Sequence, residues 1–170
     1  MLRRQAEADS RGAPTRTRVR RWLDPNLHRR TRSADLIRHI EIRTRGRGLH
    51  EITDEVQAAV RASGIDEGLC TVMVQHTSAS LVIQENADPS ARRDLEAWLD
   101  RHVPEGDPHF THTAEGPDDM PSHIRAALTA TSLSVPIERA RLALGTWQGI
   151  WLWEHRTRGS MRRCVIHVAP

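Results

Sequence analysis

The order of strand-like and helix-like segments is the feature of this sequence that most constrains its fold. Short apolar runs with β-branched residues or strict alternation predict strands, while apolar residues spaced three and four apart predict helices. Strands are predicted at residues 36–44, 69–76, 81–84, 133–135, 139–144, 148–155 and 162–168, and helices at 53–64, 88–104 and 118–128. This order is typical of an α+β domain, with mostly antiparallel or mixed sheets packed with about three helices, and not of a doubly wound parallel fold.

Several residues predict where the helices begin and end. Thr53 is expected to be the N-cap of the first helix and Gly64 its C-cap. Asp88 is expected to cap the second helix, because the proline that follows it suits the first helical position. Asp118 or Asp119 is expected to cap the third.

Length and composition predict one soluble domain. The chain has 170 residues, of which 38% are hydrophobic, enough for one core. Its apolar runs are far shorter than the ~20 residues of a membrane span, and no apolar segment of a secretory signal follows Met1. Cys70 and Cys164 lie in apolar runs without a CxxC motif, which predicts buried thiols in a reducing compartment. We therefore expect a cytoplasmic protein.

The charge divides the chain into two parts. Residues 1–34 hold ten arginines against three acidic residues, a net charge of +7, and show almost no apolar periodicity. We predict a disordered or loosely docked arm here, most simply a solvated tail. Nucleic acid is an unlikely partner except through this arm, because residues 35–170 carry a net charge of −4. These residues are expected to form the α+β domain.

Two clusters of polar residues could carry chemistry, since the motifs of P-loop, Rossmann, zinc-protease and serine-esterase proteins are absent. The first is HTSAS at residues 76–80, followed by QENADP at 84–89, at a strand end and before a helix. The second, residues 109–123, holds three histidines and two aspartates near a helix start. Such residues suit a metal with nitrogen and oxygen ligands, or acid–base catalysis. A helix start also favours phosphate.

A third cluster follows residues 145–149, which predict the turn of a hairpin. In the strand after it, Trp151 and Trp153 share one face with Trp147, whereas Glu154 and Arg156 fall on the other. Tryptophans at this spacing indicate core or subunit interface more often than a base-stacking surface.

Four segments together resemble the YjbQ family: HTSASLVIQENADP, GPDDMPSHI, LGTWQGIWLWEHR and the closing RCVIHV. The resemblance runs from about Asp35 to Pro170 and leaves residues 1–34 outside. It implies a cytoplasmic homotrimer of α+β subunits with a secondary thiamine-phosphate synthase activity. This reaction joins hydroxymethylpyrimidine diphosphate to a thiazole phosphate and releases pyrophosphate, and the main substrate stays open.

The resemblance also implies site residues. The catalytic positions are His76, His123, Asp118 and Glu154; the substrate-binding positions are Thr77, Ser78, Ser80, Asn86, Met120, Gln148 and Arg156; the positions for a divalent metal, Mg or Zn, are His76, His112, His123 and Asp88. The sequence departs from the family at Asp119, where Asn is commoner, which adds a negative charge.

Alternative functions use the same residues. In the synthase, Arg156 would stabilise the leaving diphosphate while Asp88 or Asp118 holds the ion and a histidine transfers protons. A metal-dependent hydrolase of a small phosphorylated metabolite would use the ion to activate water. A trimeric metabolite-binding module without catalysis would bind the same ligand and convert nothing.

Overall fold

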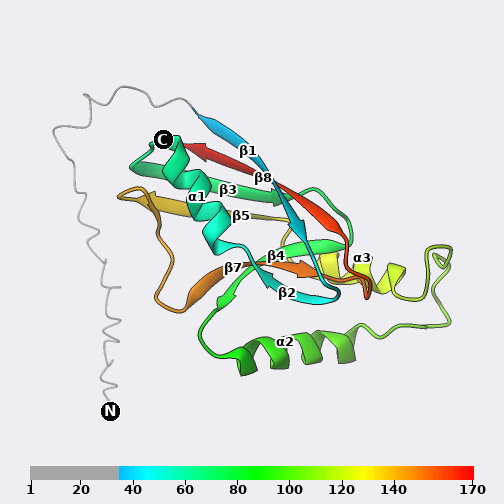
Figure 1. The fold of residues 1–170 in the computed structure, drawn as a ribbon. Coiled ribbons are helices and arrows are strands. Elements are labelled where there is room, and N and C mark those ends of the chain that lie inside the picture. Colours follow the sequence, from blue (N-terminus) through cyan, green and yellow to red (C-terminus); the bar gives the residue numbers. More distant parts are fainter. Residues whose placement is uncertain (1–34) are drawn as a thin grey trace, which may run out of the picture. The chain divides into compact units, whose positions relative to one another are not determined.

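Two antiparallel sheets form the framework of residues 35–170, the part of the chain that the computed structural model describes (Figure 1). The predictions for the arm of residues 1–34 lie outside the described residues. The five-stranded sheet has the order β1 (Leu36–Arg43), β8 (Met161–Ala169), β3 (Glu67–Val74), β5 (Ser132–Glu138), β6 (Arg141–Leu142). The three-stranded sheet has the order β2 (Gly48–Glu51), β7 (Gln148–Glu154), β4 (Ala79–Glu85).

The helices are α1 (Thr53–Ser63), α2 (Pro89–His102) and α3 (Asp119–Leu128). Figure 1 shows α1 beside the strands of the larger sheet, and α2 below the smaller one. Gly64 adopts the left-handed conformation that ends α1, and the Asp88 carboxylate accepts a hydrogen bond from the Ser90 N–H at the start of α2. Both caps and the predicted α+β class are confirmed.

Strand β7 separates two hydrophobic cores. Ile150 and Leu152 point into the larger core, between α1 and the two sheets, and neither is exposed. Trp151 and Trp153 point to the opposite side, where they pack with Leu99 of α2 in a second core. Because both faces of β7 are covered, its sequence is a continuous apolar run and not an alternating one. The prediction of a tryptophan core is confirmed for these two residues.

The outer face of the five-stranded sheet is open in the described chain. The side chains on the inner face of this sheet, such as Cys70 and Cys164, are fully buried. Burial raises the thiol pKa values of these two cysteines to about 11 and about 12. The prediction of buried thiols is thus confirmed.

No helix within residues 35–170 is long and apolar enough to cross a bilayer.

The predicted hairpin at residues 145–149 is wrong. This segment connects β6 of the larger sheet to β7 of the smaller one, so the strands on its two sides do not pair. The hairpin lies instead between β5 and β6, with Arg139 and Ala140 as a two-residue turn at φ angles of 53° and 58°. A turn with two positive φ angles matches the twist of a hairpin. Arginine and alanine rarely adopt positive φ, so these residue types do not indicate such a turn in the sequence.

The predicted cap at Thr53 is also wrong, because a tertiary contact occupies its side chain. Helix α1 begins at Thr53 itself, whose hydroxyl accepts a hydrogen bond from the Ile150 N–H at 2.9 Å and does not cap the helix. Strand β2 was not predicted from its four residues.

The β5–β6 turn makes a stability prediction. Ala140→Gly should raise the free energy of unfolding by about 1 kcal/mol, because glycine adopts a positive φ without the steric cost of a Cβ. Urea unfolding measures this change. Ala58→Gly, at an exposed position inside α1, is the control and should lower the free energy by about 1 kcal/mol. A loss of stability in both variants would contradict the turn geometry.

Candidate functional site

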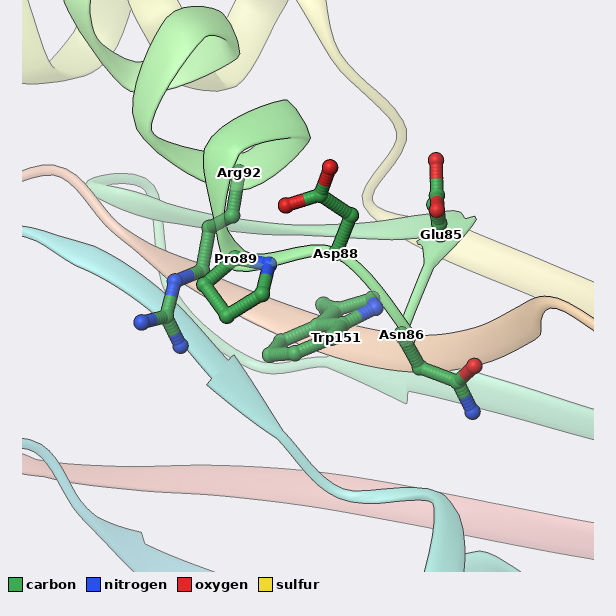
Figure 2. A pocket seen from close by; sticks show the side chains of 6 residues that line it. All are labelled: Glu85, Asn86, Asp88, Pro89, Arg92 and Trp151. Carbon is green, nitrogen blue, oxygen red and sulfur yellow. The ribbon is translucent and has the colours of Figure 1, made fainter.

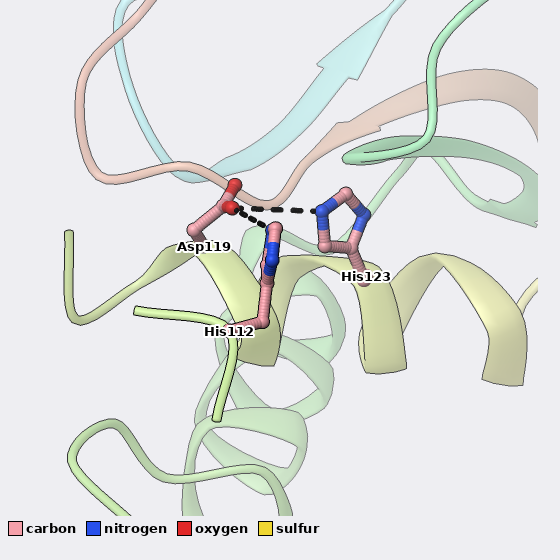
Figure 3. Close-up of side chains that lie close together, drawn as sticks. All are labelled: His112, Asp119 and His123. Atoms are coloured by element: carbon pink, nitrogen blue, oxygen red, sulfur yellow. Dashed lines mark ion pairs between the residues drawn. The ribbon is translucent and has the colours of Figure 1, made fainter. Parts of the chain in front are cut away.

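Three side chains of the third predicted helix and the loop before it converge on one point. His112 comes from the loop, and Asp119 and His123 lie one turn apart on α3 (Figure 3). The Nε2 atoms of His112 and His123 lie 2.7 and 3.6 Å from Oδ2 of Asp119. We call these three residues the triad.

The Asp119 carboxylate is the buried member of the triad. Its side chain is only 2% exposed, whereas those of His112 and His123 are 50% and 32% exposed. Its Oδ2 atom receives no hydrogen bond, although His112 Nε2 is close to it, so the contact does not have hydrogen-bonding geometry. A buried carboxylate oxygen without a donor is costly. Two imidazole nitrogens and one carboxylate oxygen around such a point form a ligand set for a metal ion.

The ring of His123 is oriented by the loop after β3. Its Nδ1 lies 3.1 Å from the carbonyl oxygen of Thr77, and a carbonyl can only accept, so Nδ1 carries the hydrogen. In the neutral ring this leaves the lone pair on Nε2, the atom that faces Asp119. A backbone carbonyl on the second nitrogen is a common way of fixing a histidine that binds a metal. Thr77 therefore contributes to the site through its backbone.

Arg156 contacts Asp119 of the triad and is itself held by Asp118. The Arg156 guanidinium pairs with Oδ1 of Asp119 and donates to Oδ2 of Asp118 and to the carbonyl oxygen of Glu115. Oδ2 of Asp118 also accepts from the N–H and hydroxyl of Thr157. Burial works against ionisation of Asp118, but these hydrogen bonds and Arg156 outweigh it and lower its pKa. Asp118 occupies the N-cap position of α3, as predicted, but its carboxylate makes no capping hydrogen bond, because the contacts with Arg156 and Thr157 engage it.

Glu154 lies inside the protein and pairs with Arg162. It is not exposed at all, and its oxygens accept hydrogen bonds from Arg162, from the Thr44 hydroxyl at 2.8 Å and from the Arg156 N–H at 3.0 Å. Burial would raise the pKa of Glu154, but these donors hold it below its usual value. The residue predicted as catalytic therefore has no surface on which a substrate could lie. It positions its neighbours.

His76 lies outside the triad. Its Nε2 accepts a hydrogen bond from the Arg163 N–H at 2.9 Å, and its Nδ1 is 3.3 Å from Arg162. Burial, followed by the charge of Arg162, lowers its pKa. Of the predicted metal ligands, the structure thus brings His112 and His123 together and places His76 in another contact.

Asp88 and Asn86 lie in a separate small pocket. Figure 2 shows them with Trp151 and with Arg92, whose guanidinium carbon is 5.9 Å from the Trp151 ring centre. The Asp88 carboxylate accepts a hydrogen bond from the Ser90 N–H at the start of α2, and it is not part of the triad. Gln148, also predicted to bind substrate, accepts a hydrogen bond from the Gly145 N–H within the connection between the sheets.

Ser80 is engaged by a buried histidine. Its hydroxyl lies 2.8 Å from Nε2 of His155, and neither residue is exposed. Burial, followed by the charge of Arg125, lowers the pKa of His155 to about 3. Ser80 is therefore buried in the interior and does not line a binding surface.

Two hollows flank the triad. Met120 lines the first with Phe110 and Pro117, beside His112, so its predicted role in binding substrate has a matching surface. Ser78 lines the second with Arg156 and Arg162.

Asp119 belonged to the predicted polar cluster but was not assigned as a metal ligand, and Arg158 was not predicted as a site residue. The spacing of Asp119 and His123, four residues apart on a predicted helix, places them on one face and could have indicated a shared ligand site. Arg158 lines the second hollow, and no pattern in the sequence separates it from the other arginines.

Comparisons with known proteins agree with this fold. A family model described as UPF0047 protein YjbQ-like matches residues 38–170. The UPF0047 protein sll1880 of Synechocystis is 53% identical over 128 residues, which cover 75% of this chain and 87% of that protein. UPF0047 protein YjbQ of Escherichia coli O157:H7 is 42% identical over 127 residues, 74% of this chain and 91% of that protein. The crystal structure of an uncharacterised YjbQ/UPF0047 protein from Clostridium acetobutylicum has a TM-score of 0.69 at 33% identity, covering 76% of this chain and 98% of that one.

The buried His155 makes a prediction about pH. Its pKa falls from 6.5 in the unfolded chain to about 3 in the folded one, so the unfolded state takes up the proton first. This contribution is fully present above pH 6.5 and is lost as the pH falls toward 3. Between pH 7.5 and 5.0 it should cost about 2 kcal/mol. In urea unfolding, His155→Gln should show a correspondingly smaller loss over this interval.

The control is His109→Gln, at an exposed histidine of the loop before α3, which should keep the wild-type pH dependence. An unchanged acid loss in His155→Gln would show that other groups cause it.

Proposed function

The chain belongs to the YjbQ-like UPF0047 family, and from this premise we propose that it is a metal-dependent hydrolase of a small phosphorylated metabolite. One observation carries the proposal: the donor-free, buried Oδ2 of Asp119 faces the Nε2 atoms of His112 and His123. An exposed and a partly exposed histidine beside a buried carboxylate leave the solvent side of such an ion open, as catalysis requires and a structural site does not.

The ligand types favour zinc over magnesium. Magnesium prefers oxygen ligands in a regular octahedron, whereas imidazole nitrogen suits zinc and other first-row transition metals. His112 and His123 would provide the nitrogens and Asp119 the oxygen, with Arg156 fixing the second oxygen of Asp119. An ion there would act as a Lewis acid toward a phosphoryl oxygen.

The reaction is the displacement of an alcohol or phosphate from phosphorus. The oxygen of a water molecule forms a bond to phosphorus, the bond to the leaving oxygen breaks, and a proton of the water ends on the leaving group. The hollow beside His112, lined by Phe110, Pro117 and Met120, would hold the organic part of the substrate, because these side chains offer mainly apolar surface.

Thiamine-phosphate synthase activity is the second candidate, and the same hollow favours it. The aromatic ring of Phe110 and the thioether of Met120 offer a surface on which a flat heterocycle can pack. In this reaction the bond between the pyrimidine methylene carbon and the diphosphate breaks, and the thiazole nitrogen forms the new bond to that carbon. A metabolite-binding module without turnover is the third possibility.

We also propose a homotrimer, with subunits meeting on the outer face of the five-stranded sheet. Large apolar side chains are exposed there on neighbouring strands, namely Ile37, Leu69, Met73 and Met161. Burying them against a second copy would remove this apolar area from water.

The triad makes a prediction about metal content. Native mass spectrometry of the untagged full chain, after loading with zinc and desalting, should show a trimer with one zinc ion per subunit. His112→Ala, His123→Ala and Asp119→Asn should each weaken zinc binding by about tenfold or more, because each removes one ligand of three. His109→Ala, an exposed histidine of the same loop outside the triad, is the matched control and should retain zinc. Equal zinc in all four variants would place the ion elsewhere.

Activity separates the three candidate functions. With zinc, the full chain should release phosphate from p-nitrophenyl phosphate or from phosphorylated metabolites, and a chelator should abolish this release. Asp119→Asn should lower the rate by about 100-fold, while His109→Ala keeps it. Formation of thiamine phosphate from its two precursors without phosphate release would favour the synthase. Ligand binding without any product would favour the binding module.

A further inference from the structure

The second hollow next to the triad is lined by three arginines. Arg156 and Arg162 contribute to it with Arg158 of the loop after β7, together with Ser78, Glu115, Gly159 and Ser160. Arg156 joins the hollow to the triad, because the same guanidinium that lines it pairs with Asp119. We call this feature the arginine hollow.

Two of the three arginines already have partners. Arg162 is paired with Glu154 inside the protein, and Arg156 with Asp118 and Asp119. Arg158 is exposed and makes no hydrogen bond or ion pair with any residue of the described range 35–170. Its charge is therefore the one in the hollow that no neighbouring carboxylate balances.

The loop that carries Arg158 is firmly held. The Ser160 N–H donates to the Thr44 hydroxyl at 2.8 Å, and the Thr44 N–H donates to the Ser160 carbonyl at 3.0 Å. A Cβ on Gly159 would lie 2.3 Å from the Thr44 carbonyl oxygen, so only glycine permits this approach. The backbone at Gly159 and Ser160 is thus fixed against a buried threonine, directly after Arg158 in the chain.

We propose that the arginine hollow binds the phosphate or diphosphate group of the substrate, with Arg158 as its main charged contact and the hydroxyls of Ser78 and Ser160 as further donors. This inference rests on the proposed function, since it assigns the anionic part of the same substrate. Guanidinium binds phosphate through two parallel hydrogen bonds, and hydroxyl groups add neutral donors.

The triad and the arginine hollow are coupled through Asp119. Its carboxylate faces the ligand nitrogens with one oxygen and Arg156 with the other. A divalent ion on the first oxygen draws negative charge away from Arg156, which leaves more positive charge facing an anion in the hollow. Metal and phosphate should therefore each strengthen the binding of the other by the same factor.

Glu115 opposes the anion. Its carboxylate is largely exposed, lines the hollow and lies 3.8 Å from Arg156. Glu115→Gln keeps the size of the side chain and removes a repulsive charge, so this variant should bind an anion more tightly. Removing the charge of Arg158 should have the opposite effect.

The test is isothermal titration of inorganic phosphate into the full chain after its metal has been removed with a chelator. Arg158→Ala should weaken binding by about tenfold, Arg158→Lys by less, and Glu115→Gln should tighten it by about threefold. Arg101→Ala, which removes an exposed arginine of α2, is the charge-matched control and should stay within about twofold of wild type. The arginines of residues 1–34 are present in every variant, so differences between variants report the hollow.

Equal phosphate affinity in wild type and Arg158→Ala, or an equal loss in Arg101→Ala, would overturn the proposal. The zinc content of Arg158→Ala should match wild type, which separates this outcome from failure of the metal site. Protein loaded with zinc should bind phosphate at least about fivefold more tightly than metal-free protein, and Asp119→Asn should remove this difference.

Discussion

The buried ion pair between Glu154 and Arg162 is the interaction on which the rest of the site depends. Glu154 ends the central strand of the smaller sheet, and Arg162 lies on β8 of the larger one, so the pair connects the two sheets. Both residues are buried, and losing one partner of such a pair typically costs about 3–5 kcal/mol. Glu154 also binds Thr44 and the backbone of Arg156. It therefore sets the position of the loop from which the site is held.

From this pair a chain of contacts leads to the surface. The backbone of Arg156 is held by Glu154, and its guanidinium holds Asp118 and Asp119 at the start of α3. Asp119 is thereby kept beside the two histidines, one of which is oriented by the carbonyl of Thr77. His112 in the triad and Arg158 in the arginine hollow are both exposed. A divalent ion and an anion would each bind next to Arg156, which explains why we couple their affinities.

A local prediction from the sequence succeeds where a side chain interacts only with its own helix, and it fails where groups distant in the chain compete for that side chain. The caps at Gly64 and Asp88 were predictable, because each satisfies backbone geometry or a backbone N–H of its own helix. Thr53 does not cap α1, and Asp118 stands at the N-cap of α3 without a capping hydrogen bond, because distant groups, the Ile150 N–H and Thr157, engage their side chains. Glu154 was recognised as important, but a buried ion pair and a catalytic acid look alike in a sequence. Only the position of Arg162 distinguishes them.

The sequence by itself determined the α+β class, the helices with their two local caps, the buried faces of the strands and the family, because these depend on periodicity, turn chemistry and motif order within short segments. It also placed His112 and His123 in one predicted group of metal ligands, and the structure brings these two side chains together. The tertiary structure decided which residues join them: Asp119 in place of His76 and Asp88, and Arg158 beside Arg156 in the neighbouring hollow. The physical reason is that a ligand site needs atoms within a few ångströms of one another. Here the pairing of two sheets and the buried charge between them bring together segments that are far apart in the chain.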